Sequence, residues 1–140
     1  MNKLSIELSE NNVGCYINTN LKNINEEQTL EIKKLLNKHG VLFFKDQNLS
    51  PEEYISFASH FGKPAEYPML KPHKDFKDIY VIERKKTDTG MNFGEGPHTD
   101  SSYLANPPSY TMLQAINVPE DWKGNTLFYK QLLAYDALPD

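Results

Sequence analysis

The chain has 140 residues, of which 39% are hydrophobic and 24% are charged, and these proportions are typical of a globular domain and exclude a disordered or fibrous chain. Its net charge is −4 and its lysines are scattered among acidic residues, so no basic surface is expected for nucleic acid. No apolar run has the length of a membrane span, and the first twenty residues lack a signal-peptide pattern. Cys15 is the single cysteine, so no internal disulfide can form. We therefore predict a cytoplasmic protein.

The first third of the sequence contains patterns of two strands and a helix. Alternating apolar residues predict a short strand at residues 4–8. Asn25 is a suitable N-cap and Gly40 a suitable stop, and the apolar stripe between them predicts a helix from about residue 26 to residue 39. The short apolar run at residues 41–44 predicts a strand that is buried on both faces.

The rest of the sequence predicts one helix followed mainly by strands. Ser50 and Pro51 form a helix start, and Gly62 ends that helix. Later strands are expected at residues 79–82, 98–103, 110–118 and 126–128, and a last helix begins in residues 131–138. Strands without helices between them favour an α+β fold with helices outside an antiparallel sheet, such as half of a jelly roll. Because the C-terminal residues contain no stop signal, we expect the chain to be incomplete.

The segment with the most chemical information contains His98-Thr99-Asp100. On an extended strand the side chains at i and i+2 lie on the same face, so an imidazole and a carboxylate would lie side by side. Two histidines and a carboxylate on one face of an octahedron are a typical Fe(II) site, because they leave positions open for a cosubstrate and O₂. Taken alone, the tripeptide is more often a structural histidine–aspartate pair than a metal site.

Several blocks around this tripeptide make the interpretation more specific. They are residues 40–47, 57–62, 98–103, 107–113, 124–128 and 134–139. In their order and approximate spacing these blocks resemble the taurine dioxygenase (TauD/TfdA) family, and the resemblance covers nearly the whole chain from about residue 12. It implies an α+β fold, with an incomplete double-stranded β-helix (jelly-roll) and flanking helices, as the N-terminal portion of one dioxygenase domain.

The resemblance also implies roles for three residues. His98 and Asp100 would be ligands of Fe(II), and Thr126 would hydrogen-bond a carboxylate of the cosubstrate 2-oxoglutarate. The sequence departs from the family's Gly-Gly-Asp-Thr before Thr126, where it has Lys123-Gly124-Asn125. Pro97 stands where the family often has a tryptophan. Without the family context, Thr126 would be interpreted as an ordinary strand residue.

Two parts of the family's site have no counterpart in this chain, namely the second metal histidine and the arginine that pairs with 2-oxoglutarate. His39, His60 and His73 all precede the motif and are expected to be surface or capping histidines. Arg84 is the only arginine, and we expect it to be a solvated charge on a strand end.

The substrate side is predicted from two segments that line the pocket in the family. They correspond here to residues 67–70, with Tyr67 and Leu70 as candidate substrate contacts, and to residues 92–96. Tyr67-Pro68 replaces a histidine–proline pair of taurine-cleaving members, so taurine is not favoured as the substrate. Tyr67 and Leu70 could equally be wall residues.

The resemblance implies an oxygenase that uses O₂ to hydroxylate a small organic substrate and releases succinate and CO₂, with this chain as a truncated form. Thr99, Ser101 and Tyr103 are candidates for fixing the two metal ligands, or are ordinary strand residues. The alternatives are a non-catalytic binding or assembly module of the same fold and a cupin-like metal protein in which His60 or His73 joins His98. A homo-oligomer remains open, and neither a nucleic acid nor a membrane is expected as a partner.

Overall fold

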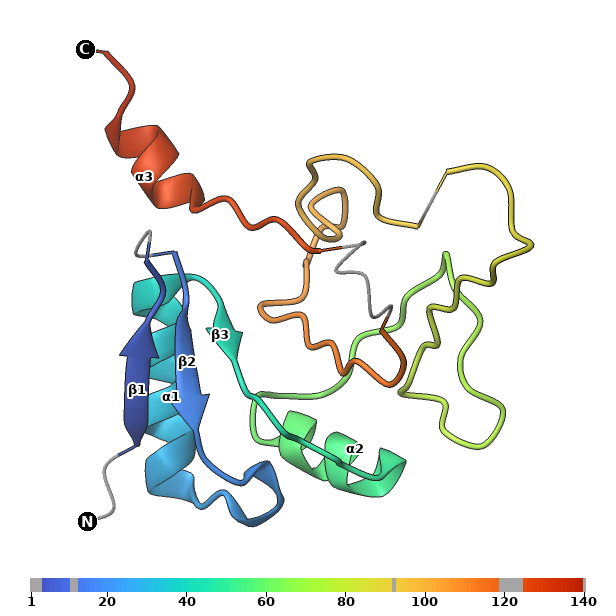
Figure 1. Cartoon of the computed structure of the whole chain (residues 1–140), viewed down its shortest axis with the longest axis horizontal. Helices are drawn as coiled ribbons and strands as arrows, with labels where there is room; N and C mark the ends of the chain where they lie inside the picture. Colours follow the sequence, from blue (N-terminus) through green and yellow to red (C-terminus); the bar gives the residue numbers. More distant parts are fainter. Residues whose placement is uncertain (1–3, 11–12, 92, 119–124, 140) are drawn as a thin grey trace. The chain divides into compact units, whose positions relative to one another are not determined.

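The computed structural model describes residues 4–10, 13–91, 93–118 and 125–139 (Figure 1). They belong to two compact units, of which the first combines Met1–Ser50 with Ala115–Asp140 and the second is Pro51–Gln114. No helix in the described ranges is long and apolar enough to cross a membrane. The predicted metal pair therefore lies in the second unit, and Thr126 lies in the first.

The first unit is built on a three-stranded sheet in the order β1-β2-β3 (Figure 1). Strand β1 (Ser5–Leu8) pairs antiparallel with β2 (Cys15–Asn18), and β2 pairs in parallel with β3 (Leu42–Phe43). The prediction for residues 4–8 is confirmed. The predicted burial of residues 41–44 on both faces is wrong, because both residues of β3 are only half-buried, and the parallel pair departs from a wholly antiparallel sheet.

Helix α1 (Glu26–His39) begins and ends where the sequence predicts. Asn25 accepts a hydrogen bond from the Gln28 backbone at 2.9 Å, and the Gln28 side chain accepts one from the Asn25 backbone at 3.2 Å, so each satisfies a helix N–H. Gly40 ends the helix at φ +82° and donates to the Leu36 carbonyl. The core of this unit includes Ile32 of the helix, which is 1% exposed. A short 3-10 helix, η1 (Leu21–Asn23), precedes α1.

A close approach at Gly14 joins the sheet to the end of α1. Its φ is +85°, and a Cβ atom there would lie 2.6 Å from a methyl group of Val41, so only glycine fits. Gly14 donates to the His39 carbonyl at 3.0 Å, and Cys15 donates to the Val41 carbonyl at 3.2 Å.

Cys15 is fully buried, and this burial raises the pKa of its thiol. This burial favours a packing role for Cys15 over a reactive one.

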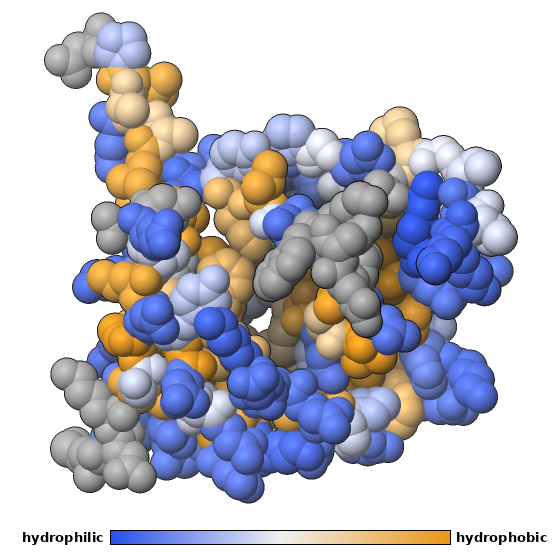
Figure 2. All heavy atoms as spheres, viewed as in Figure 1, coloured by the Kyte–Doolittle hydropathy of each residue, from blue (hydrophilic) through white to orange (hydrophobic). Residues whose placement is uncertain are grey.

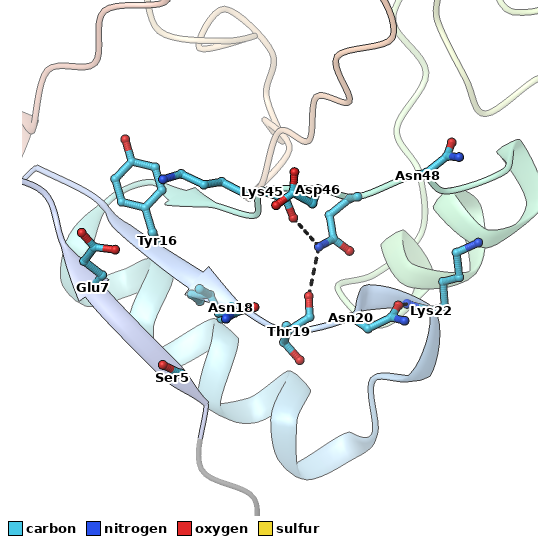
Figure 3. A pocket seen from close by; sticks show the side chains of 12 residues that line it. Ser5, Glu7, Tyr16, Asn18, Thr19, Asn20, Lys22, Lys45, Asp46 and Asn48 are labelled. Carbon is cyan, nitrogen blue, oxygen red and sulfur yellow. Dashed lines mark hydrogen bonds between the residues drawn. The ribbon is translucent and has the colours of Figure 1, made fainter.

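Gln47 ties the end of β3 to the turn after β2. Its side-chain amide donates to the carbonyls of Thr19 at 3.0 Å and Lys45 at 2.7 Å, and its oxygen accepts from the Leu21 backbone at 3.2 Å. Thr19, Lys45 and Gln47 line a surface hollow of about 570 Å³. Figure 3 shows the Lys45 side chain extending toward the Tyr16 ring. Its ammonium lies 4.3 Å from the centre of that ring. None of the predicted site residues lines this hollow.

The C-terminal segment of the first unit is extended and then helical. Helix α3 (Gln131–Asp136) confirms the predicted last helix. Residues 126–128 do not form the predicted strand, although the Phe128 ring lies edge-on to Phe43 with centroids 5.7 Å apart. Figure 2 shows apolar side chains over α3, where Leu132 and Tyr135 are 60% and 74% exposed. An apolar face of this kind is typical of a surface that another element or partner covers.

The second unit contains helix α2 (Pro51–Ser59) and long irregular segments. Among the described residues of this unit, Phe57 is the one large apolar side chain that is buried. The strands predicted at residues 79–82, 98–103 and 110–118 are not formed, and the pairing that the described residues show here is a single bridge between Pro72 and Tyr80. An extended segment becomes a stable strand only when neighbours pair with it, and composition cannot reveal whether such neighbours are present.

His39 is buried, with 6% exposure, so the prediction that it is a surface or capping histidine is wrong. Its Nε2 atom has no hydrogen-bond partner in the described part of the chain. Burial, and then the charges of Lys38 and Lys130, lower the pKa of its imidazole. Lys130 is held nearby, since its ammonium donates to the Lys38 carbonyl at 2.8 Å.

This environment predicts a loss of stability in weak acid. Because the folded chain binds the proton more weakly than the unfolded chain, the free energy of unfolding should fall as pH drops through the ordinary histidine pKa of about 6.5. Urea unfolding of the original chain and of His39→Gln between pH 8 and pH 5 measures this, and the variant should lose less stability. His60→Gln, at an exposed histidine, is the control. Equal losses in the original chain and His39→Gln would contradict the prediction.

Candidate metal site

His98 and Asp100 lie side by side, with the imidazole Nε2 atom 3.2 Å from the carboxylate Oδ1 atom. Two neighbouring ligands in an octahedron, each about 2.1 Å from the metal, lie about 3.0 Å apart. The separation therefore fits two cis ligands of one ion. Both side chains are accessible, at 53% and 42% exposure.

The other polar atom of each side chain, His98 Nδ1 and Asp100 Oδ2, has its own partner. The atoms Nε2 and Oδ1 are thereby left facing each other. The His98 Nδ1 atom lies 2.9 Å from the Gly96 carbonyl, and an N–H donated there leaves the Nε2 lone pair directed at Asp100. A nitrogen and a carboxylate oxygen 3.2 Å apart are close enough to bind the same metal ion. Histidines that bind metals usually donate their second N–H to such a carbonyl or carboxylate.

Turns, and not the predicted strand, bring the two side chains together. Gly96 has φ +90° and Ser101 has φ +50°, so the chain bends on both sides of the motif. The Leu104 backbone donates to the Ser101 carbonyl at 3.0 Å and closes the second bend. A Cβ atom on Gly94 would lie 3.5 Å from the His98 ring, an ordinary van der Waals distance, so Gly94 lies close to the imidazole. The predicted juxtaposition is thus present, although the predicted element is wrong.

One residue that the sequence analysis missed contacts this pair. The Thr111 hydroxyl donates to the Asp100 Oδ2 atom at 2.7 Å. Of the residues expected to fix the ligands, Ser101 is buried, whereas Thr99 and Tyr103 are exposed. The sequence shows only that Thr111 carries a hydroxyl group in the strand predicted at residues 110–118. This gave no reason to predict a contact between Thr111 and Asp100.

Within the described ranges, no third histidine, cysteine or acidic side chain joins His98 and Asp100 in a potential metal site. His60 is exposed, and His73 accepts a hydrogen bond from the Asp75 backbone at 3.1 Å. The cupin-like alternative requires His60 or His73 to join His98 as a metal ligand, and in the described ranges neither does. Arg84 is exposed, but it also donates to three loop carbonyls, those of Asp88, Gly90 and Met91.

Thr126, the predicted 2-oxoglutarate contact, lies in the first unit and is exposed. It lines a surface hollow of about 310 Å³ together with Tyr16, Phe43 and Phe128. Lys123 and Gly124, where the sequence departs from the family before Thr126, lie outside the described residues.

The candidate substrate residues lie in the second unit and are both half-buried. The Tyr67 ring lies edge-on to Tyr80 and Phe93, with centroids 6.1 Å and 6.2 Å away, and the Tyr80 hydroxyl accepts from the Tyr67 backbone at 2.9 Å. Leu70 donates its backbone N–H to the Tyr67 carbonyl. Phe93 directly precedes Gly94 in the sequence, and a Cβ atom on Gly94 would lie 3.5 Å from the His98 ring. Asn92 of the predicted pocket loop is outside the described residues.

Comparisons with known proteins show which family the chain resembles. Residues 13–140 match the family described as "Taurine catabolism dioxygenase TauD, TfdA family". The chain is 33% identical over 124 residues to the alpha-ketoglutarate-dependent 2,4-dichlorophenoxyacetate dioxygenase of Cupriavidus pinatubonensis, covering 78% of this chain and 43% of that relative. It is 31% identical over 137 residues to the alpha-ketoglutarate-dependent sulfonate dioxygenase of Saccharomyces cerevisiae, covering 90% of this chain and 33% of that relative.

One solved structure resembles part of this chain in its fold. The crystal structure of a proposed alpha-ketoglutarate-dependent taurine dioxygenase from Burkholderia xenovorans matches with a TM-score of 0.51 and 22% identity, over 59% of this chain and 32% of that one. The chain spans less than half the length of these relatives. Because the family match covers residues 13–140, the chain belongs to the TauD/TfdA family.

Proposed function

We propose that this chain carries the first part of an Fe(II)- and 2-oxoglutarate-dependent dioxygenase site, in a polypeptide that hydroxylates a small organic substrate with O₂ and releases succinate and CO₂. The observation that carries the proposal is the 3.2 Å separation of His98 Nε2 and Asp100 Oδ1, with their other polar atoms held by Gly96 and Thr111. The fold that goes with this activity is a double-stranded β-helix, of which residues 1–140 form the N-terminal portion.

Each residue of the chain has a limited task in this proposal. His98 offers a neutral nitrogen and Asp100 a negative oxygen to Fe(II), and Thr126 donates a hydrogen bond to a carboxylate of 2-oxoglutarate. The bound iron supplies the chemistry that activates O₂ and couples decarboxylation of 2-oxoglutarate to substrate hydroxylation. A third protein ligand and a cation for the far carboxylate of 2-oxoglutarate would come from residues beyond these 140.

The aromatic group around Tyr67 supports a substrate with an apolar or aromatic part. Tyr67, Tyr80 and Phe93 provide ring faces and edges, and Leu70 adds a half-buried aliphatic side chain. The relative from Cupriavidus pinatubonensis is named for an aromatic substrate, which agrees with this chemistry. The net charge of −4 does not favour a nucleic acid substrate, and a single buried thiol suits the cytoplasm.

The second candidate function is a non-catalytic binding or assembly module. The exposed apolar side chains of α3 favour it, because a partner or a second copy could cover them. Uptake of a metal that depends on His98 would favour the oxygenase. A dimer formed through the apolar face, without metal uptake, would favour the module.

The activity test uses the 140-residue chain with Fe(II) and 2-oxoglutarate under O₂ and measures succinate. With two protein ligands, metal should be retained weakly, and succinate should form far more slowly than at the rates of about 1–10³ s⁻¹ that are typical of enzymes. His98→Ala should abolish the iron-dependent part of this succinate. Succinate formation at an ordinary enzyme rate would show that the ligand set assigned here is incomplete.

A further inference from the structure

Thr111 contacts the predicted metal ligand Asp100 through the carboxylate oxygen that does not face His98. Its hydroxyl donates to Asp100 Oδ2 at 2.7 Å, and the other oxygen of the same carboxylate, Oδ1, is the one that faces His98 Nε2 at 3.2 Å. The two oxygens of Asp100 therefore have different neighbours. One oxygen is engaged by the protein, and the other faces the place where a cation would bind.

This division of roles matters for how a carboxylate binds a metal ion. A carboxylate can bind through one oxygen or through both, and binding through both would occupy one more position of the octahedron. A donor on Oδ2 stabilises that oxygen outside the coordination sphere and fixes the rotation of the carboxylate. The positions needed by a bidentate cosubstrate and by O₂ would then stay open.

Two contacts on either side of Thr111 hold its backbone against helix α2. The Tyr110 ring lies edge-on to Phe61, which follows this helix, with centroids 5.6 Å apart. On the other side, the Tyr54 hydroxyl donates to the Met112 carbonyl at 2.6 Å. A tyrosine phenol is protonated at neutral pH and can donate this bond, and burial raises the pKa of Tyr54 further, to about 12. Thr111 itself is exposed, so its side chain is not needed to fill a core.

We propose that Thr111 is a positioning residue that holds Asp100 in a one-oxygen binding mode through the hydrogen bond to Oδ2. This inference rests on the proposed function, because it requires that Asp100 binds a metal ion. Hydrogen-bond partners of metal ligands typically change metal affinity about 10- to 100-fold when they are removed.

The test is a titration of the 140-residue chain with Co(II), followed by calorimetry and by the visible absorption of the bound ion. Thr111→Val, which keeps the shape but removes the hydroxyl, should weaken Co(II) binding about 10- to 100-fold and change the absorption spectrum. Thr111→Ser, which keeps the hydroxyl, should restore both. Thr87→Val is the matched control at an exposed threonine of another loop, and it should bind as the unsubstituted chain does. Circular dichroism confirms that each variant is folded.

A double substitution tests whether Thr111 acts through Asp100. In the Asp100→Ala background, Thr111→Val should cause no further loss of affinity. Unchanged binding in Thr111→Val, or an equal loss in Thr111→Ser, would overturn the positioning role alone, provided that His98→Ala still weakens binding. If the unsubstituted chain binds no Co(II), the proposed function and this inference both fail.

Discussion

Alanine at His98 or at Asp100 is expected to weaken Co(II) binding by at least about tenfold, because each substitution removes one of the two protein ligands. The effect of the double variant should not be the sum of the two, because the atoms Nε2 and Oδ1 lie 3.2 Å apart and would serve the same ion. Isothermal titration calorimetry at fixed pH and buffer measures the affinity.

The control for this experiment is His60→Ala, at an exposed histidine next to the end of α2. It should leave Co(II) affinity unchanged, which excludes nonspecific binding to any accessible imidazole. If His98→Ala and His60→Ala have the same effect, the ion does not bind at the predicted pair.

Alanine at Ile32 is expected to produce the largest loss of stability in the first unit. This side chain is 1% exposed and lies on α1, so its truncation removes apolar contacts and leaves a cavity. Such substitutions cost about 2–5 kcal/mol, which is a large fraction of the 5–15 kcal/mol by which domains are usually stable. Urea unfolding followed by far-ultraviolet circular dichroism measures the change.

Leu30→Ala is the matched control, because Leu30 lies on the same helix and is 59% exposed. Its substitution should change the free energy of unfolding by a few tenths of a kcal/mol. Equal effects of Leu30→Ala and Ile32→Ala would contradict the burial of the Ile32 side chain.

The helices were predictable because their determinants are local. Asn25 and Gly40 bound α1 by hydrogen bonds within a few residues, and these bonds are encoded in the sequence immediately around them. The strands were less predictable. Cys15 and Ile17 do alternate with less buried residues in β2, but this strand has four residues and was not predicted, while four predicted strands are absent. Strand formation depends on distant neighbours that local composition does not describe.

The candidate site was predictable to the extent that its chemistry is concentrated in one tripeptide. His98 and Asp100 are two residues apart, so almost any extended or turning backbone can bring them together. Thr111 could not be found in this way, since its hydrogen bond to Asp100 spans eleven positions and depends on the turn at Ser101. Thr126 lies in a different compact unit from His98 and Asp100. That these three residues bind iron and 2-oxoglutarate at one site therefore stays a prediction from the family.

The most direct test of the central claim is an anaerobic titration of the chain with Fe(II) and 2-oxoglutarate, followed by the weak visible charge-transfer band of the chelated complex. The account predicts a band that is lost in His98→Ala and Asp100→Ala and retained in His60→Ala. A band that persists in the His98 and Asp100 variants, or no uptake of Fe(II) by the unsubstituted chain, would contradict the assignment of these two residues as metal ligands.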